Sequence, residues 1–168
     1  HPEYRRQRQM CIRDRGTCYS LDELDEIARV AKDNNCKSHI DGARIFNASV
    51  SSSLSTERMA REYDTISVCL SKGLGAPVGS VLAGPSDTLY KAHRWRKMFG
   101  GGMRQAGVLA AAGIYALDNN IDRLSQDHNR AREIALAVSD MDSYTVNLNQ
   151  VQTNMVYVCL LYTSDAAD

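Results

Sequence analysis

Apolar residues recur every third or fourth position in the first regular segment of the chain. These positions are Leu21, Leu24, Ile27, Ala28 and Ala31. Such spacing predicts an amphipathic helix with one buried face. Ser20 and Glu23 fit a capping box at its start, in which the serine hydroxyl caps first-turn amides and the glutamate reaches back. The polar residues 33–35 (DNN) are expected to end the helix.

Short apolar runs alternate with further helical segments and predict buried strands. The expected strands cover residues 36–40, 65–70 and 79–83. The expected helical segments are residues 43–48, a turn capped by Thr56 and running through Arg61, and a helix opened by Pro85 that ends near Phe99, with a polar loop at 49–55. Alternation of helix and strand favours an α/β layered architecture.

The second half of the chain is predicted to be mainly helical. Residues 105–117 are rich in alanine with two glycines, which indicates a buried helix packed closely on its neighbours. Residues 121–139 form a long amphipathic pattern. Two short apolar runs, 144–148 and 155–158, predict strands. We therefore expect a large domain over residues 16–140 and the start of a smaller C-terminal domain over 141–158.

The two ends of the chain lack helical and strand periodicity. Residues 5–15 read RRQRQMCIRDR and residues 159–168 read CLLYTSDAAD. DNA that encodes one tail can be the reverse complement of DNA that encodes the other, and the shared string resembles the transposon-end adapter of sequencing libraries. We therefore expect residues 1–15 and 159–168 to be non-native tails and exclude them from the fold prediction.

Composition narrows the class of protein. The chain has 168 residues, with 20 basic and 20 acidic side chains and a formal net charge of zero, which disfavours binding to nucleic acid. No apolar run approaches the roughly 18 residues of a membrane span. The five cysteines show no metal-binding or redox spacing, so we expect no metal site and a reducing, cytoplasmic compartment.

The strongest chemical pattern lies in residues 67–79 (SVCLSKGLGAPVG), where an apolar run ends in Ser71 and Lys72 inside a glycine-rich turn. A lysine there can approach a flat ligand closely and suits Schiff-base chemistry with a carbonyl cofactor. Asp41 and Arg44 follow the preceding predicted strand, and ligands of α/β sheets bind outside the carboxyl ends of strands. A lysine with a carboxylate that keeps a pyridine nitrogen protonated is the pair that pyridoxal 5'-phosphate requires.

Three segments closely resemble the low-specificity threonine aldolases of the aromatic amino acid beta-eliminating lyase/threonine aldolase family. They are residues 39–48 (HIDGARIFNA), 64–84 (DTISVCLSKGLGAPVGSVLAG) and 96–113 (RKMFGGGMRQAGVLAAAG). The resemblance implies an aspartate-aminotransferase-like fold of type I. The chain would then be a fragment of the large domain of a PLP-dependent transferase, with a mixed, mostly parallel sheet and flanking helices.

The same resemblance implies roles for individual residues. Lys72 corresponds to the Schiff-base lysine, Asp41 to the partner of the pyridinium nitrogen, and Arg44 to a residue beside the cofactor ring near its phenolic oxygen. Lys97 and Arg104 match basic positions that help to form the site, with a dimer interface as one arrangement. The implied reaction is retro-aldol cleavage of L-threonine or L-allo-threonine to glycine and acetaldehyde, by a homodimer or homotetramer.

Parts of the family's site have no counterpart in this sequence. The phosphate-binding loop and the histidine that stacks on the cofactor ring would precede Gly16, and the arginine for the substrate carboxylate would follow Val158. We therefore expect this polypeptide by itself to be inactive. Two alternatives stay open: another PLP-dependent lyase of the same fold, such as a β-eliminating lyase, and a non-catalytic fragment or assembly subunit.

Histidines and cysteines receive no chemical role. His39 alternates with apolar neighbours and is predicted to be a packed core residue, and Cys36 and Cys69 occupy core-like positions. His93 and His128 lie on predicted helices and are expected to be solvated. Residues 100–102 (GGG) lack the pattern of a phosphate-binding loop, so they are expected to break a helix or form a mobile connector.

Overall fold

The computed structural model describes residues 16–161, so most of both predicted tails (1–15 and 162–168) lies outside the described residues. The elements are α1 (Leu21–Asp33), β1 (His39–Asp41), α2 (Ile45–Ser52), α3 (Thr56–Ala60), β2 (Thr65–Cys69), β3 (Ser80–Ala83), α4 (Ser86–Met98), α5 (Gly107–Asn119), α6 (Leu124–Ser139), β4 (Tyr144–Thr145), a 3-10 turn (Leu148–Gln150) and β5 (Cys159–Leu160). Within this range, none of the helices has the length and apolar character needed to cross a bilayer.

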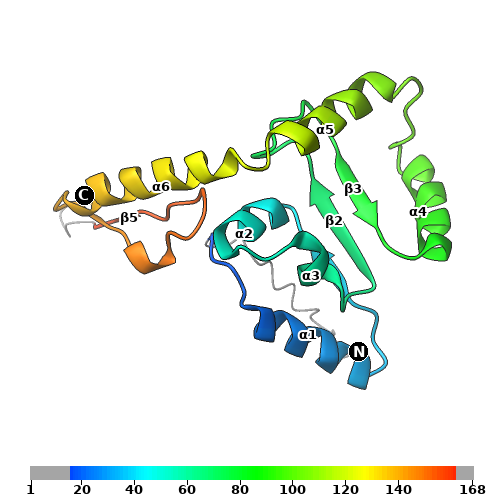
Figure 1. The fold of residues 1–168 in the computed structure, drawn as a ribbon, viewed down its shortest axis with the longest axis horizontal. Helices are drawn as coiled ribbons and strands as arrows, with labels where there is room; N and C mark the ends of the chain where they lie inside the picture. The colour runs from blue at the N-terminus through cyan, green and yellow to red at the C-terminus, as the bar shows by residue number, and fades with distance from the viewer. Residues whose placement is uncertain (1–15, 162–168) are drawn as a thin grey trace, which may run out of the picture.

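The central sheet has the order β1-β2-β3 and is mixed, as predicted. β1 pairs with β2 in parallel, with His39 opposite Thr65 and Asp41 opposite Ser67. β3 pairs with β2 in the antiparallel sense. Helices α1, α2 and α3 lie to one side of the sheet, and α4 lies beyond β3 on the other side (Figure 1). The α/β fold class expected from the sequence is confirmed.

Helix α1 begins and ends where its sequence predicts. The Ser20 hydroxyl accepts from the Glu23 backbone N–H at 3.3 Å, and the Glu23 carboxylate accepts from the Ser20 N–H at 2.7 Å. Leu24 and Ala28 face the core, where Leu24 packs with buried residues of α2 and α3. The Tyr63 hydroxyl also donates to the Leu24 carbonyl at 2.8 Å, which fixes α1 against the segment that enters β2.

Two boundaries near α2 differ from the sequence prediction. The polar loop expected from residue 49 is helical through Ser52, and within this last turn the Ser52 hydroxyl donates to the Ala48 carbonyl at 2.8 Å. The helix ends at Ser53, which has a φ of 58°. Helix α3 is capped by Ser55, whose hydroxyl accepts from a backbone amide, and not by Thr56 as predicted.

Two residues predicted to be buried near β1 are exposed. The strand is shifted toward its C-terminal end relative to the prediction, and only Ile40 of its three residues is buried. Cys36 lies outside the strand, in the turn after α1, and is exposed. His39 is exposed as well, and its Nδ1 lies 2.8 Å from the Thr65 hydroxyl on β2. The alternation that suggested a core position for His39 reflects a strand with one buried residue.

Helix α5 is mostly exposed, contrary to the prediction of a buried helix. Among its residues only Gly113 and Ala116 are buried, whereas Val108 is 81% exposed. The buried face of α5 is narrow, and at this face small residues allow a close approach. A Cβ on Gly113 would lie 3.0 Å from Leu70 Cδ1. Alanine-rich composition therefore marked a narrow contact stripe, to which the partly buried Leu117 also belongs.

Helix α6 forms where the sequence predicts a long helix and runs away from the sheet (Figure 1). Its predicted apolar face is only partly buried, because Ile134 is 57% and Leu136 45% exposed. Its Ala131 and Ala135 pack with Val151 in a separate small core. Beside this core, β4 pairs with β5 at residues 159–160, so the strand predicted at 155–158 lies further along the chain. This pairing involves the first residues of the predicted C-terminal tail; the non-native origin of both tails stays a prediction, as does the domain division.

A carboxylate joins the amino ends of the two parallel strands. Asp64, just before β2, accepts from the Ser38 backbone N–H at 2.9 Å and from Lys37 Nζ at 2.7 Å. The Thr65 N–H donates to the Ser38 carbonyl at 3.2 Å and continues the contact into the ladder. The hydrogen bond from Lys37, with that from Ser38, lowers the pKa of Asp64.

We expect Asp64→Asn to lower the thermal unfolding midpoint at pH 7. A carboxylate with a lowered pKa stabilises the fold above the ordinary aspartate value of about 4, and this contribution is lost as the pH falls through the lowered value. The gap between the variant and the unsubstituted protein should therefore close in acid. Exposed Asp142, changed to Asn, serves as the control and should shift the midpoint little at any pH.

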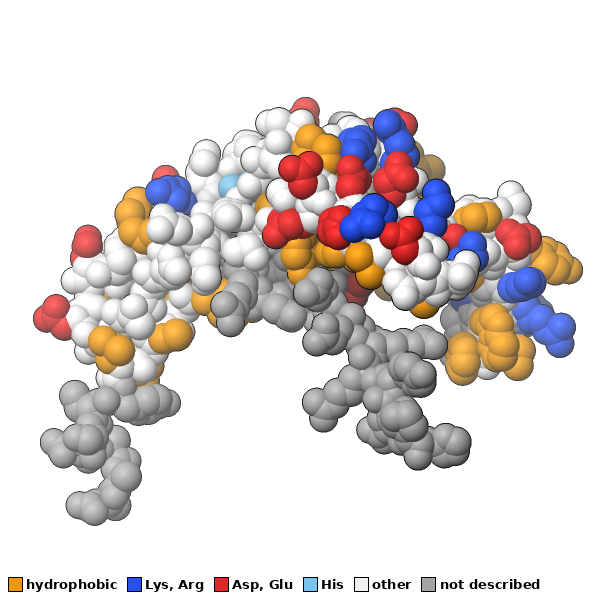
Figure 2. Space-filling view, turned by 90° about the horizontal axis from the view of Figure 1, so that it is seen from below, with side chains coloured by type: hydrophobic (Ala, Val, Ile, Leu, Met, Phe, Trp, Pro, Cys, Tyr) orange, Lys and Arg blue, Asp and Glu red, His pale blue; other side chains and the backbone are white. Residues whose placement is uncertain are grey.

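We expect the 168-residue polypeptide expressed alone to aggregate. Apolar side chains gather beside basic ones at the end of the molecule formed by α4, where Tyr90 is 82% and Phe99 81% exposed (Figure 2). Apolar surface of this kind is normally covered in a soluble protein. Size-exclusion chromatography with light scattering measures the outcome, and a clean monomer would contradict the expectation. Replacing Tyr90 and Phe99 together by glutamate should reduce the aggregated fraction.

Candidate active site

The carboxyl ends of β1 and β2 bring two of the predicted site residues to one edge of the sheet. Asp41 is the last residue of β1, and Lys72 follows the end of β2 after Leu70 and Ser71. Because the two strands are adjacent and parallel, both connections leave the sheet at the same edge. The two residues thus follow neighbouring strands, and their membership of one site stays a prediction.

The turn after β1 requires a glycine. A Cβ on Gly42 would lie 2.9 Å from Ile66 Cδ1 and 3.0 Å from the Ser67 carbonyl oxygen, so the turn packs directly on β2. The Ile45 N–H donates to the Gly42 carbonyl at 2.9 Å and closes the turn into α2. Arg44 is the N-cap residue of α2 and is half-buried.

The loop that carries Lys72 is held by its own backbone. The Gly75 N–H donates to the Lys72 carbonyl at 2.8 Å, in a turn that requires the positive φ of Gly75 (76°). At the base of the loop, Leu70 accepts from the Ala76 N–H at 3.1 Å and donates to the Gly79 carbonyl at 2.9 Å. These bonds fix the loop while the Lys72 side chain stays exposed.

Apolar packing connects the loop that carries Lys72 to the turn that follows β1. Leu74 is 3% exposed and lies in a cluster with buried residues of α5 and α6, including Leu124. The Asn120 side chain donates to the Leu74 carbonyl at 2.7 Å. Phe46, two residues after Arg44, packs against the same cluster. The lysine loop and the turn that follows Asp41 therefore rest on one core.

The predicted basic residues Lys97 and Arg104 lie on a different part of the chain. Lys97 is exposed in the last turn of α4, and Arg104 is exposed in the segment between α4 and α5. Within residues 16–161, no ion pair joins any two of the five predicted site residues. The described chain thus places Asp41, Arg44 and Lys72 on adjacent connections, and it shows no contact of Lys97 or Arg104 with them.

The three glycines after α4 cap that helix. Gly100 has a φ of 81° and donates to the Lys97 carbonyl at 3.2 Å, while Gly101 donates to the Arg96 carbonyl at 2.8 Å. This is the Schellman pattern of helix termination. A Cβ on Gly102 would lie 3.0 Å from Lys97 Cδ, so the glycines also pack against the lysine side chain. The glycines therefore end helix α4, which confirms the prediction that they break a helix.

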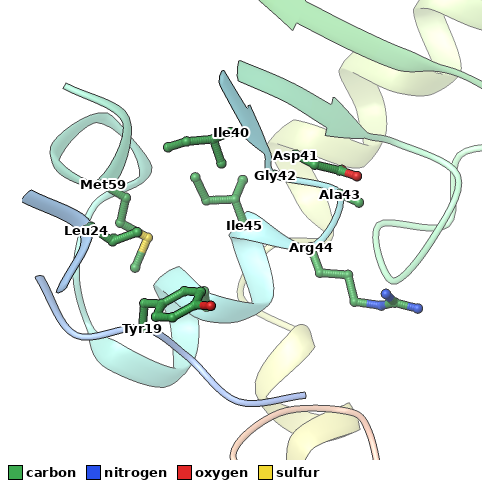
Figure 3. Close-up of a pocket in the computed structure, with 10 residues that line it drawn as sticks. Tyr19, Leu24, Ile40, Asp41, Gly42, Ala43, Arg44, Ile45 and Met59 are labelled. Atoms are coloured by element: carbon green, nitrogen blue, oxygen red, sulfur yellow. The ribbon is translucent and has the colours of Figure 1, made fainter. Parts of the chain in front are cut away.

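Two cavities lie near the strands of the described chain. A small apolar cavity of about 40 Å³ beside the turn after β1 is lined by Tyr19, Leu24, Met59 and neighbours that include Asp41 and Arg44, although these two charged side chains point away from its interior (Figure 3). Ligand pockets usually exceed about 300 Å³, so this is a packing void. A polar hollow of about 470 Å³ lies near Lys37 and Asp64, at the amino ends of the strands.

A buried polar pair near the lysine loop has no counterpart in the sequence prediction. His128, predicted to be solvated, is half-buried on α6, and its Nε2 lies 3.1 Å from Asn47 Nδ2 on α2. Burial lowers the pKa of His128, against the opposing charge of Asp127. The two partners are 81 positions apart, so no local pattern could reveal their contact. His93, by contrast, is exposed as predicted.

Comparison with known proteins identifies close relatives. Residues 11–160 match the family described as beta-eliminating lyase. The protein named probable low-specificity L-threonine aldolase 2 of Arabidopsis thaliana is 46% identical over 143 residues, which are 85% of this chain and 40% of that protein. The low specificity L-threonine aldolase of Escherichia coli K12 is 46% identical over 135 residues, 80% of this chain and 40% of its own length.

Solved structures give the same picture. A threonine aldolase from Leishmania major superposes with a TM-score of 0.66 at 25% identity, and the match covers 79% of this chain and 40% of that one. The chain thus spans about 40% of the length of the relatives it matches.

We expect Gly42→Ala to destabilise the protein by about 1–3 kcal/mol, because an added methyl group has no room against β2. Gly107→Ala is the matched control: open space surrounds that position, and alanine at the start of α5 should leave stability unchanged or raise it by up to about 1 kcal/mol. Chemical denaturation of both variants measures the difference. Equal stability of the two variants would show that the turn does not need glycine.

Proposed function

The chain belongs to the beta-eliminating lyase family, among the low-specificity L-threonine aldolases, and we propose that the intact protein cleaves L-threonine or L-allo-threonine to glycine and acetaldehyde. The observation that carries the proposal is an exposed lysine on a hydrogen-bonded glycine loop, on the strand connection adjacent to that of Asp41. Relatives at 46% identity bear the aldolase name, which supports this substrate class.

Pyridoxal 5'-phosphate fits the chemical groups at this edge of the sheet. Lys72 offers an exposed primary amine for the cofactor's aldehyde, and Asp41 offers an exposed carboxylate for the ring nitrogen. Arg44, at the N-cap of α2, offers a guanidinium for the phenolic oxygen of the ring. When bound, the cofactor supplies an electron sink for the charge that develops as the carbon–carbon bond breaks.

Each residue then has a definite task. Lys72 would hold the cofactor through its exposed amine, and the backbone hydrogen bonds of its loop would keep that amine in place. Asp41 holds a proton at the ring nitrogen, which preserves the electron sink. Arg44 orients the ring from the start of α2, a helix whose first turn is tied to the turn after β1. A fixed geometry of this kind lowers the entropic part of the barrier.

The rest of the proposed site comes from outside the described edge. Asp41 and Lys72 lie on open surface, and we infer that a phosphate-binding loop, a ring-stacking histidine and an arginine for the substrate carboxylate are supplied by other parts of the intact protein. We propose that Lys97 and Arg104 contribute to a site formed in a homodimer or homotetramer. Their exposure on an apolar and basic end of the molecule supports this role.

We extend the proposal to domain organisation and location. Residues 16–140 form part of the cofactor-binding domain, and residues 141–158, which pack in the separate core around α6, begin a smaller one. The cysteines of residues 16–161 are unpaired thiols, which supports a reducing, cytoplasmic setting.

The family description favours one alternative function. A β-eliminating lyase would use the same lysine and carboxylate but would expel a substituent from the β-carbon. The products separate the two reactions: the aldolase releases acetaldehyde, and the eliminating lyase releases ammonia and a keto acid. Incubation of the intact protein with threonine and with a β-substituted alanine, followed by assays for both product sets, distinguishes them.

We expect Lys72→Ala to abolish the borohydride-stable adduct that the intact protein forms with pyridoxal 5'-phosphate, and with it the release of acetaldehyde from threonine. Lys91→Ala, which removes an exposed lysine of α4, is the matched control and should retain both. Mass spectrometry of the reduced, digested protein locates the modified lysine. An adduct that survives in Lys72→Ala would show that the lysine assignment is wrong.

A further inference from the structure

Asn47 is a buried polar residue that the proposed chemistry leaves unused. It lies on α2 and is 3% exposed. Its Nδ2 lies 3.1 Å from Nε2 of His128 on α6. With the amide as donor, His128 accepts at Nε2 and is neutral, and its lowered pKa agrees with this state. A buried amide needs such a partner, since an unpaired one costs stability.

The same amide lies beside the residue after Lys72. A Cβ on Gly73 would be 3.5 Å from Asn47 Oδ1 and 3.7 Å from Nδ2, which is ordinary contact distance. The same Cβ would be 2.8 Å from Leu124 Cδ2, so a side chain at position 73 would displace Leu124. The lysine loop therefore passes Asn47 and Leu124 at a point where glycine allows a close approach.

On the basis of the proposed function, we propose that Asn47 and His128 form a positioning pair for Lys72. His128 fixes the plane of the Asn47 side chain, and the fixed amide holds Gly73, so that the amine of Lys72 is presented to its cofactor from one direction. Neither residue touches the reacting atoms. The pair also joins α2, the helix whose N-cap is Arg44, to α6, the helix whose first residue is Leu124.

Simple space filling does not account for this arrangement. An apolar side chain of similar size at position 47 could fill the space beside Gly73 without needing a hydrogen-bond partner such as His128. The hydrogen bond instead selects one orientation of a planar group, which apolar packing does not do. Loss of the acceptor at position 128 should therefore disturb the loop at residues 71–76 through Asn47, although no hydrogen bond joins His128 to Lys72.

The test compares Asn47→Leu, His128→Leu and His128→Gln in the intact protein. The two leucine variants remove the pair, while glutamine keeps a neutral acceptor for the Asn47 amide. After pyridoxal 5'-phosphate is added to the cofactor-free protein, the leucine variants should form the borohydride-trapped Lys72 adduct about tenfold more slowly, and the glutamine variant at close to the unsubstituted rate. Without cofactor, amide hydrogen exchange over residues 71–76 should be faster in the leucine variants only.

Thr153→Val provides the matched control for stability. Thr153 is fully buried and donates to the Gly16 carbonyl at 2.8 Å, in a part of the chain away from the lysine loop. This variant should lose stability without slowing adduct formation or altering exchange at 71–76. Unsubstituted rates in both leucine variants, or equal slowing in Thr153→Val, would overturn the positioning role. Absence of the adduct in the unsubstituted protein would instead overturn the proposed function. The exchange measurement, which needs no cofactor, would still show whether the Asn47–His128 pair holds the loop at residues 71–76.

Discussion

Parallel pairing of β1 with β2 brings the ends of two strands, and the chemical groups that follow them, to one edge of the sheet. The ladder is short, so its register depends on what joins the strands before they begin. Asp64 does this through Ser38, and the first ladder contact follows directly. A slip of one residue would turn Asp41 to the other face of the sheet. Contacts at the amino ends of β1 and β2 therefore determine where Asp41 and Lys72 lie at the carboxyl ends.

The lysine loop combines a fixed base with an open upper surface. Backbone hydrogen bonds and the buried Leu74 hold the loop from below, whereas Lys72 projects into open space. This division of roles lets one short segment be rigid and reactive at once. The same core contains Phe46 from α2, so packing that stabilises one connection also stabilises the other. Stability and chemistry depend here on the same contacts.

Features set by neighbours in sequence could be predicted, and those set by distant partners could not. The capping box of α1, the positions of β2 and β3 and the presence of helix α6 follow from local spacing. The placement of Asp41 and Lys72 after neighbouring strands also follows, whereas their membership of one site stays a prediction. Burial of α5 was predicted wrongly because alanine content does not say how many sides have neighbours. The environment of His128 depends on Asn47, far away in sequence, and the exposure of His39 depends on which face of β1 is covered.

Helix α6 joins two separate regions of packing. Its first residue, Leu124, lies under Gly73, and its later residues Ala131 and Ala135 belong to the small core beside β4. A helix of 16 residues is about 24 Å long and bends little over that distance. Because one continuous helix carries both contacts, the packing beneath the lysine loop and the small core beside β4 share a single stiff element. The two regions are therefore linked by secondary structure and not by a flexible connection.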